Sequence, residues 1–155
     1  MKKKIVYFDM DGVLCQFRKK FNEEIERNPS IKFPQATYNF FTNLEPHDEM
    51  VHLYKMLDSD DRLEVHILTA PSYMNPMCYT EKRVWVENHL GIDAASRMVI
   101  TGHKNLLKGD YLIDDNATGK GQDNFEGAFL LVDESNIRKS VSTILKVIGD
   151  DLEWD

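Results

Sequence analysis

The segment from residue 4 to residue 14 constrains the fold of this 155-residue chain more than any other. It starts as a short apolar run of β-forming residues, 5–8. Two carboxylates, Asp9 and Asp11, follow this run, and Gly12 ends it. A buried strand that stops in this way places negative charge at its carboxyl end, where open α/β sheets bind ligands. We therefore expect a buried strand that leads directly into a functional site.

The two carboxylates of this segment point to a cation. Side chains alternate along an extended chain, so Asp9 and Asp11 are expected on the same side. Two carboxylates at such a short separation repel each other unless a cation or a shared proton lies between them. Mg²⁺ suits this position, because it binds oxygen ligands and leaves room for a substrate phosphate. A surface turn is the alternative, since Asp and Gly are common turn residues.

The remaining sequence alternates between strand-like and helix-like segments. Strands are predicted at residues 63–68, 98–100, 111–113 and 127–132, and helices at 17–25, 50–57, 81–90 and 137–148. Thr80 is expected to cap the helix at 81–90. Such alternation implies a parallel sheet. The predicted fold is therefore α/β, a single domain over residues 1–155 with a Rossmann-like parallel sheet flanked by helices.

Residues 15–45 are expected to form a small helical cap inserted after the first strand. Beyond its helix this segment is aromatic and irregular. Most of its aromatic side chains are expected to form the core of the insertion itself. Phe17 is the exception, because it follows the aspartate pair closely enough to reach a bound ligand.

Four strand ends carry residues suited to phosphate chemistry. In a parallel sheet these ends share one edge, which brings together the pair Asp9 and Asp11, Thr69, Lys104 and the pair Asp114 and Asp115. This combination suggests phosphoryl transfer through an aspartyl-phosphate, with Asp9 as the nucleophile. Mg²⁺ would offset the repulsion between carboxylate and phosphate. Lys104 and Thr69 would hold the phosphoryl oxygens, and Asp11 would act as general acid and base.

Lys82 is a further candidate. It lies in the first turn of the helix predicted at 81–90, where a positive charge opposes the helix dipole. A ligand or a carboxylate beside Lys82 would explain this placement. A solvated lysine is the alternative.

The overall composition excludes several classes of function. Hydrophobic residues make up 42% and charged residues 29% of the chain, as in soluble globular proteins. A net charge of −7 argues against a broad basic surface for nucleic-acid polymers or membranes. No stretch is long enough to span a membrane. The two cysteines, Cys15 and Cys78, provide no disulfide framework and indicate reduced thiols in a cytoplasmic protein.

Four short segments together resemble the motifs of the haloacid dehalogenase superfamily of phosphatases. They are residues 9–14, 67–70, 101–104 and 112–115, which occur in the order of those motifs and at suitable spacing. Within the superfamily, the chain is similar to the 5′(3′)-deoxyribonucleotidase family. The further matching features are Phe17, Phe40 and Phe41, residues 44–46 and 81–87, and the ten-residue spacing between Lys104 and Asp114.

The resemblance implies a role for each matched residue. Asp9 corresponds to the nucleophile and a metal ligand, and Asp11 to the general acid and base, whose backbone carbonyl also binds the metal. Asp115 corresponds to a direct Mg²⁺ ligand, with Asp114 behind it, orienting water or Lys104. The remaining correspondences are phosphate contacts for Thr69 and Lys104, a lysine near the phosphate for Lys82, and an aromatic flanking the base for Phe17.

Departures from the animal members of the family bear on the substrate. Ala70 stands where they have a serine that helps to hold phosphate, Gly102 stands where they have an arginine, and the cap is shorter. The resemblance implies Mg²⁺-dependent hydrolysis of small phosphomonoesters, with nucleoside monophosphates as the expected substrates. The alternatives are a sugar-phosphate or other small-metabolite phosphatase and a non-catalytic nucleotide-binding member. The sequence leaves the oligomeric state open, a homodimer included.

Overall fold

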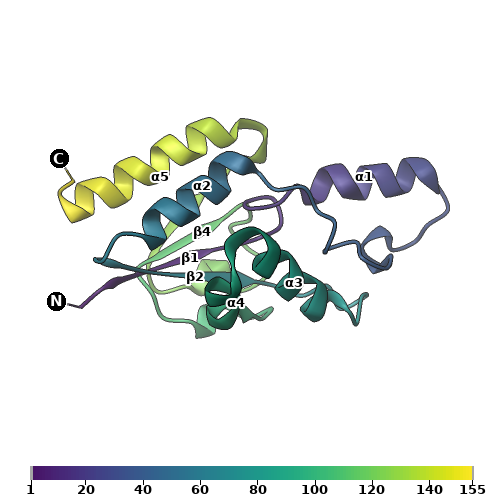
Figure 1. Cartoon of the computed structure of the whole chain (residues 1–155), viewed down its shortest axis with the longest axis horizontal. Helices are drawn as coiled ribbons and strands as arrows, with labels where there is room; N and C mark the ends of the chain where they lie inside the picture. Colours follow the sequence, from purple (N-terminus) through teal and green to yellow (C-terminus); the bar gives the residue numbers. More distant parts are fainter. Residues whose placement is uncertain (1, 155) are drawn as a thin grey trace.

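The computed structural model describes residues 2–154, which form a five-stranded parallel sheet (Figure 1). The strands are β1 (Lys4–Phe8), β2 (Leu63–Thr69), β3 (Val99–Ile100), β4 (Tyr111–Asp114) and β5 (Ala128–Leu131). Their order across the sheet is β3-β2-β1-β4-β5. The predicted α/β class and the parallel arrangement are confirmed. The structure places β1 at the centre of the sheet.

Helices fill the connections between these strands. The α-helices are α1 (Phe17–Arg27), α2 (Asp48–Asp58), α3 (Cys78–Leu90), α4 (Ile92–Arg97) and α5 (Ile137–Leu152), and the 3₁₀ helices are η1 (Pro34–Ala36), η2 (Lys104–Leu106), η3 (Gln122–Asn124) and η4 (Glu134–Asn136). Figure 1 shows α2 and α5 side by side, and α1 at the end of the molecule away from both termini. Within residues 2–154, no helix combines the length and the apolar character needed to cross a bilayer.

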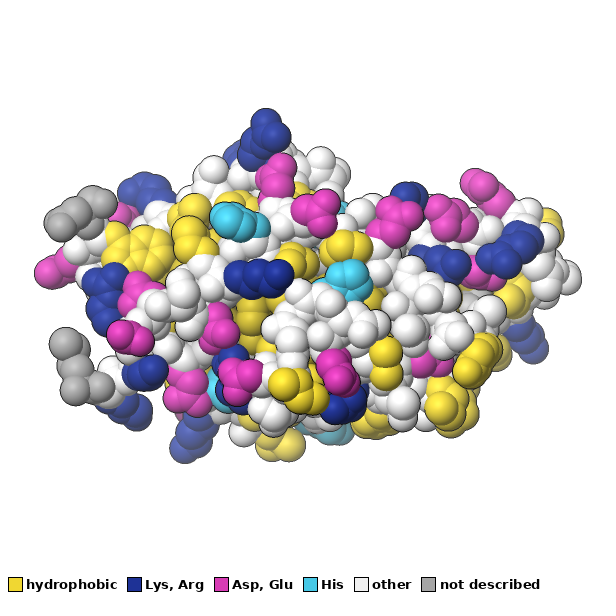
Figure 2. Space-filling model, viewed as in Figure 1, with side chains coloured by type: hydrophobic (Ala, Val, Ile, Leu, Met, Phe, Trp, Pro, Cys, Tyr) yellow, Lys and Arg dark blue, Asp and Glu magenta, His cyan; other side chains and the backbone are white. Residues whose placement is uncertain are grey.

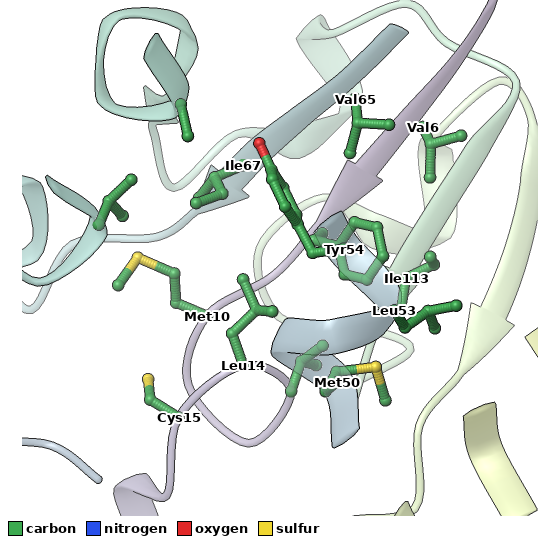
Figure 3. Packing of buried hydrophobic residues seen from close by; sticks show 14 of the residues in the cluster. Val6, Met10, Leu14, Cys15, Met50, Leu53, Tyr54, Val65, Ile67 and Ile113 are labelled. Atoms are coloured by element: carbon green, nitrogen blue, oxygen red, sulfur yellow. The ribbon is translucent and has the colours of Figure 1, made fainter. Parts of the chain in front are cut away.

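The strands bury alternate residues on opposite faces of the sheet, as a period of two requires. One face joins residues of α2, α3, α4 and α5 in a single large cluster, to which β1 contributes Val6 and Phe8. Figure 3 shows Met50, Leu53 and Tyr54 of α2 packed within this cluster. The other face forms a smaller cluster of Tyr7, Leu68, Leu112 and Phe125. Because both faces of β1 are covered, its carboxyl end is held rigidly inside the fold.

The register of the sheet places the predicted strand ends at one edge. Phe8 is level with Ile67 of β2 and Ile113 of β4. The Asp9 backbone N–H donates to the Ile113 carbonyl at 2.9 Å, so Asp9 lies directly at the carboxyl end of the pairing between β1 and β4. In Figure 1 the strands of the sheet point toward the end of the molecule that carries α1. The region predicted as a cap therefore lies beyond the edge that carries the candidate site.

The predicted start of the third helix was wrong. α3 begins at Cys78, and Met77 occupies the position before its first residue. Thr80 therefore lies inside the helix rather than capping it. Lys82 lies beyond the first turn, so the argument from the helix dipole does not apply to it. Lys82 nevertheless meets a carboxylate, that of Asp11.

Candidate active site

A cleft of about 310 Å³ opens at the carboxyl edge of the sheet, below the start of α1. Its volume lies within the range of small-molecule sites. Of the predicted site residues, those that line the cleft are Asp9, Asp11, Phe17, Lys104, Asp114 and Asp115. Thr69 and Lys82 do not line it, and both are completely buried. The fold thus gathers residues that are far apart in the sequence around one opening.

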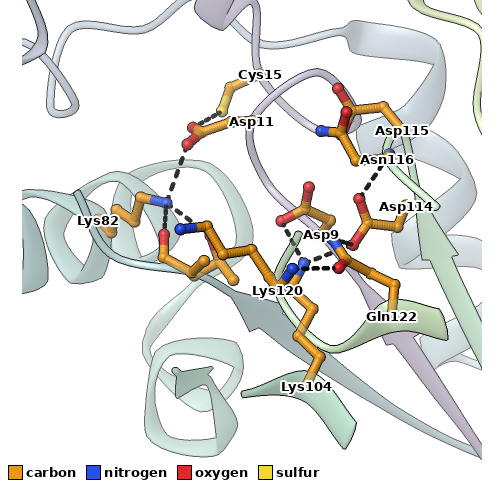
Figure 4. Close-up of polar contacts among 12 residues, drawn as sticks. Asp9, Asp11, Cys15, Lys82, Lys104, Asp114, Asp115, Asn116, Lys120 and Gln122 are labelled. Atoms are coloured by element: carbon orange, nitrogen blue, oxygen red, sulfur yellow. Dashed lines mark hydrogen bonds and ion pairs between the residues drawn. The ribbon is translucent and has the colours of Figure 1, made fainter. Parts of the chain in front are cut away.

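Lys104 links two carboxylates at the base of the cleft. Its Nζ lies 3.1 Å from Asp9 Oδ1 and 2.6 Å from Asp114 Oδ2 (Figure 4). Burial alone would lower the pKa of Lys104, but the charges of Asp9 and Asp114 outweigh it and raise that pKa. Lys104 therefore stays protonated, and its position holds Asp9 in one orientation.

Asp114 is held by neighbours on both of its carboxylate oxygens. The Asn116 backbone N–H donates to Oδ1 at 3.0 Å. Oδ2 accepts from Lys104 and, at 3.4 Å, from the side-chain amide of Gln122. Asp114 is also fully buried. This arrangement lets Asp114 position Lys104 and its neighbours.

Three carboxylates come together next to this lysine. Oxygen atoms of Asp9, Asp114 and Asp115 all lie within 4.8 Å of one another. Burial, together with the charge of Asp9, raises the pKa of Asp114 to about 6 and that of Asp115 to about 8. Such a group repels itself when ionised, and a hard divalent cation such as Mg²⁺ would relieve the repulsion. The donor set therefore fits the predicted Mg²⁺.

Gly12 makes room for one of these carboxylates. Its φ of +79° lies in the left-handed region that glycine adopts without strain. A Cβ at this position would overlap the carboxylate of Asp115. Glycine is therefore needed here for its backbone angle and for the approach of Asp115.

Asp11 lines the same cleft as Asp9 but turns its carboxylate toward Lys82. The extended chain from which the two side chains were predicted to lie on one side is not present here. The chain leaves the extended conformation after Phe8 and folds into a tight turn, in which the Leu14 N–H donates to the Met10 carbonyl at 2.8 Å. The alternation of side chains consequently stops before Asp11. In Figure 4 the Asp11 carboxylate lies apart from the acidic group around Asp9 and turns toward Lys82.

Lys82 is enclosed by three oxygen atoms. Its Nζ donates to Asp11 Oδ2 at 3.1 Å, to Thr69 Oγ1 at 2.6 Å and to the Ala70 carbonyl at 2.7 Å. Burial raises the pKa of Asp11, and the charge of Lys82 opposes that rise. The carboxylate that the sequence analysis sought for Lys82 is thus Asp11. Cys15 completes this pocket, with its Sγ 3.6 Å from Asp11 Oδ1.

Aromatic side chains form the wall opposite the carboxylates. The ring centroid of Phe17 lies 5.4 Å from that of Phe40 and 6.2 Å from that of Phe41. Phe17 and Phe41 line the cleft, whereas Phe40 is buried behind them. The Phe41 backbone N–H donates to Glu81 of α3 at 3.0 Å, which ties this wall to the body of the fold. The predicted exposure of Phe17 to a ligand agrees with this position.

The sequence analysis missed several polar residues of the cleft. They are Arg18, Gln35, Ser72, Asn116, Lys120, Gln122 and Glu134. The Oε1 atom of Gln35 is buried and has no partner among the described residues. Lys120 and Gln122 come from the glycine-rich loop that follows Asp115. Polar residues in a loop that directly follows a catalytic strand end are the signal that could have identified them.

The comparison with family models decides the family. Residues 29–144 match the model described as "5' nucleotidase, deoxy (Pyrimidine), cytosolic type C protein". The chain belongs to this family. Its members are phosphoric monoester hydrolases, and the chain is an enzyme of this class. The resemblance to the deoxyribonucleotidases is thereby confirmed.

Relatives of this member of the nucleotidase family occur in phages, bacteria and animals. A putative 5′(3′)-deoxyribonucleotidase of Vibrio phage KVP40 is 32% identical over 81% of this chain and 73% of its own length. The cytosolic 5′(3′)-deoxyribonucleotidase of Homo sapiens is 31% identical over 76% of this chain and 73% of its own length. A putative 5′(3′)-deoxyribonucleotidase of Bordetella pertussis is 33% identical over 69% of this chain, but this match spans only 59% of that relative.

Solved structures support the superfamily through the fold. The L-2-haloacid dehalogenase of Xanthobacter autotrophicus aligns with a TM-score of 0.51 over 94% of this chain and 88% of its own. The sequences are 15% identical, so this likeness concerns the fold alone. The nucleotidase family chain thus has the haloacid dehalogenase-like fold that its motifs predicted.

Proposed function

We propose that this protein is a Mg²⁺-dependent phosphatase that hydrolyses (deoxy)nucleoside monophosphates through an aspartyl-phosphate. The observation that carries the proposal is the position of Asp9. Its carboxylate lies 3.1 Å from Lys104 and belongs to the group of three carboxylates at the base of the cleft. An oriented carboxylate beside a cation site is the arrangement that nucleophilic attack on a phosphate requires.

In the first step, an oxygen of Asp9 attacks phosphorus and the ester P–O bond breaks. The leaving alcohol oxygen takes a proton from Asp11, whose raised pKa suits a general acid. Asp9 then carries the phosphoryl group as a mixed anhydride. In the second step, water attacks phosphorus and gives a proton back to Asp11. The bond between phosphorus and the Asp9 oxygen breaks, so that phosphate is released and Asp9 is restored. Bound Mg²⁺ supplies positive charge that offsets the repulsion between carboxylate and phosphate.

Other residues of the chain hold the reacting groups in place. Asp9, Asp115 and the backbone carbonyl of Asp11 are the proposed Mg²⁺ ligands, and Asp114 supports them through Lys104. Lys104 is placed to stabilise the phosphoryl oxygens as well. Thr69 Oγ1 accepts a hydrogen bond from Lys82, and the phosphate contact of this buried residue stays a prediction.

The aromatic wall supports a nucleotide as the substrate. Phe17 and Phe41 line the same cleft as the carboxylates, and a flat apolar surface suits a nucleobase. We propose that residues 15–45, which supply this wall, act as a small cap, and that the chain forms a single domain. On the face seen in Figure 2, basic side chains are interspersed with acidic ones, which agrees with a small-molecule substrate rather than a nucleic-acid polymer.

The cellular setting is also a proposal. Both cysteines are buried and unpaired, which agrees with a reducing cytoplasm. The relatives include cytosolic and mitochondrial human proteins. A homodimer stays a prediction.

Phosphate release from a panel of substrates tests this function. The panel contains nucleoside 5′- and 3′-monophosphates, deoxy and ribo, together with sugar phosphates, each with Mg²⁺ and with EDTA. We expect Mg²⁺-dependent release that favours nucleotides. Turnover confined to sugar phosphates would retain the chemistry and reject the nucleotide. Nucleotide binding with no turnover of any substrate would reject the enzymatic proposal.

The stability of the protein should depend on pH and Mg²⁺ together. The pKa values of Asp114 and Asp115 are raised to about 6 and about 8, so between pH 4 and pH 8 the folded metal-free protein holds protons that the unfolded chain has released. Its free energy of unfolding should therefore fall as the pH rises through this range. Mg²⁺ competes with these protons, so its stabilising effect should grow with pH.

Thermal melting at pH 5.5 and pH 8, with EDTA and with Mg²⁺, measures this linkage. We expect a larger Mg²⁺-dependent rise in melting temperature at pH 8. Asp115→Asn serves as the control, because it removes the group with the higher pKa and should shrink the difference between the two pH values. An equal Mg²⁺ effect at both pH values in the unchanged protein would contradict the linkage.

A further inference from the structure

The cleft has little positive charge left for an anionic substrate. Lys104 already pairs with Asp9 and Asp114, and Lys82 already pairs with Asp11. A phosphomonoester that approaches these carboxylates needs a cation that is not already neutralised, beyond any metal. Two basic residues of the cleft remain, Arg18 and Lys120. Arg18 is exposed on α1, and among the described residues no hydrogen bond or ion pair fixes its side chain.

The backbone of Lys120 is fixed against the catalytic strand ends. Its carbonyl accepts from the Lys104 backbone N–H at 2.8 Å. Its own N–H donates to Gln122 Oε1 at 2.7 Å, and the same Gln122 side chain donates to Asp114 (Figure 4). Hydrogen bonds thus connect the backbone of Lys120 directly to Lys104 and, through the Gln122 side chain, to Asp114.

The side chain of Lys120 is supported by an aromatic ring rather than by a carboxylate. Its Nζ lies 5.4 Å from the centroid of the Tyr73 ring. Within residues 2–154, no carboxylate forms an ion pair with it. A cation–π contact positions an ammonium group without neutralising its charge. Lys120 consequently places an ammonium group without a paired carboxylate in the lining of the cleft that also contains Ser72 and Lys104.

Gly102 lies close to the end of the Tyr73 side chain. A Cβ at residue 102 would overlap the hydroxyl of Tyr73. The absence of a side chain therefore leaves room for the Tyr73 hydroxyl beside the loop after β3, while the Tyr73 ring contacts Lys120. Tyr73, Gly102 and Lys120 form one structural unit built by three separate loops.

We propose that Lys120, held on Tyr73, is a substrate-binding residue that contacts the phosphate group. This inference rests on the proposed phosphatase function and adds to it a residue outside the four motifs. Lys120 would act on binding more than on the chemical step, because Lys104 and the carboxylates remain in place without it. Its three N–H donors suit phosphate oxygens.

The test compares Lys120→Met and Lys120→Arg with Lys108→Met as the matched control, because Lys108 is an exposed lysine that does not line the cleft. The first measurement is the binding of inorganic phosphate by calorimetry in the presence of Mg²⁺. We expect Lys120→Met to weaken phosphate binding roughly tenfold, as loss of a charged hydrogen bond does. Lys120→Arg should retain most of the affinity, and Lys108→Met all of it.

The second measurement is hydrolysis of a nucleotide and of p-nitrophenyl phosphate. Lys120→Met should raise KM for both substrates by a similar factor and leave kcat nearly unchanged. Tyr73→Leu should raise KM in the same direction but less. A rise confined to the nucleotide would overturn the phosphate contact, and so would unchanged phosphate binding. Phosphate binding that depends on Lys120, in a protein that hydrolyses no phosphomonoester, would reject the phosphatase function and leave this inference standing.

Discussion

Asp9→Asn should abolish phosphate release, with kcat reduced at least roughly 10³-fold. The amide cannot form the mixed anhydride, although its size matches that of the carboxylate it replaces. Lys104 keeps its 2.6 Å contact with Asp114, so the base of the cleft should remain ordered. The measurement is kcat for the best nucleotide of the panel, with saturating Mg²⁺.

The control for this variant separates loss of chemistry from loss of structure. Asp9 raises the pKa values of Asp114 and Asp115, so its neutral replacement should relieve repulsion and leave the melting temperature equal or higher. Asp123→Asn, at an exposed aspartate outside the cleft, should change neither activity nor melting. An Asp9→Asn protein with near-normal turnover would show that another group is the nucleophile.

Lys82→Met should reduce kcat about 100-fold with little change in KM. Lys82 is completely buried, and it orients Asp11 through a 3.1 Å contact. Without this lysine the general acid loses both its orientation and its neighbouring positive charge. The same change should lower the free energy of unfolding by roughly 3 kcal/mol, because it leaves a largely buried carboxylate unpaired.

A double-mutant cycle distinguishes this role from a direct phosphate contact. Asp11→Asn and Lys82→Met should be strongly non-additive in kcat and in stability, since each change removes the same interaction. If Lys82 instead contacts the phosphate, as the resemblance implies, KM should rise and the two changes should add. Lys146→Met, at an exposed ion pair on α5, is the matched control and should alter stability by less than about 0.5 kcal/mol.

Much of the fold followed from local pattern. The apolar run before Asp9 predicted a buried strand, and both faces of β1 are covered in the structure. Parallel strands place their carboxyl ends at one edge, which is why Asp9, Lys104 and Asp114 could be predicted to meet. The motifs also identified the family, which the comparison with family models confirmed.

Local pattern failed where the backbone stopped being regular. The alternation rule placed Asp11 beside Asp9, but the turn after Phe8 rotates Asp11 toward α3. The helix start at Thr80 was predicted from its capping propensity, whereas packing allowed α3 to begin at Cys78. Both errors occurred at the ends of elements, where tertiary contacts outweigh propensity.

The sequence by itself determined the parallel sheet, the buried strand before Asp9 and the residues that converge at the carboxyl edge, because these depend on periodicity and on the geometry common to all parallel sheets. Only the tertiary structure decided which charge faces which. Lys82 meets Asp11 across 71 residues, and Lys120 rests on Tyr73 from another loop. Such pairings depend on how loops and helices pack in three dimensions, and no local pattern of residues encodes that packing.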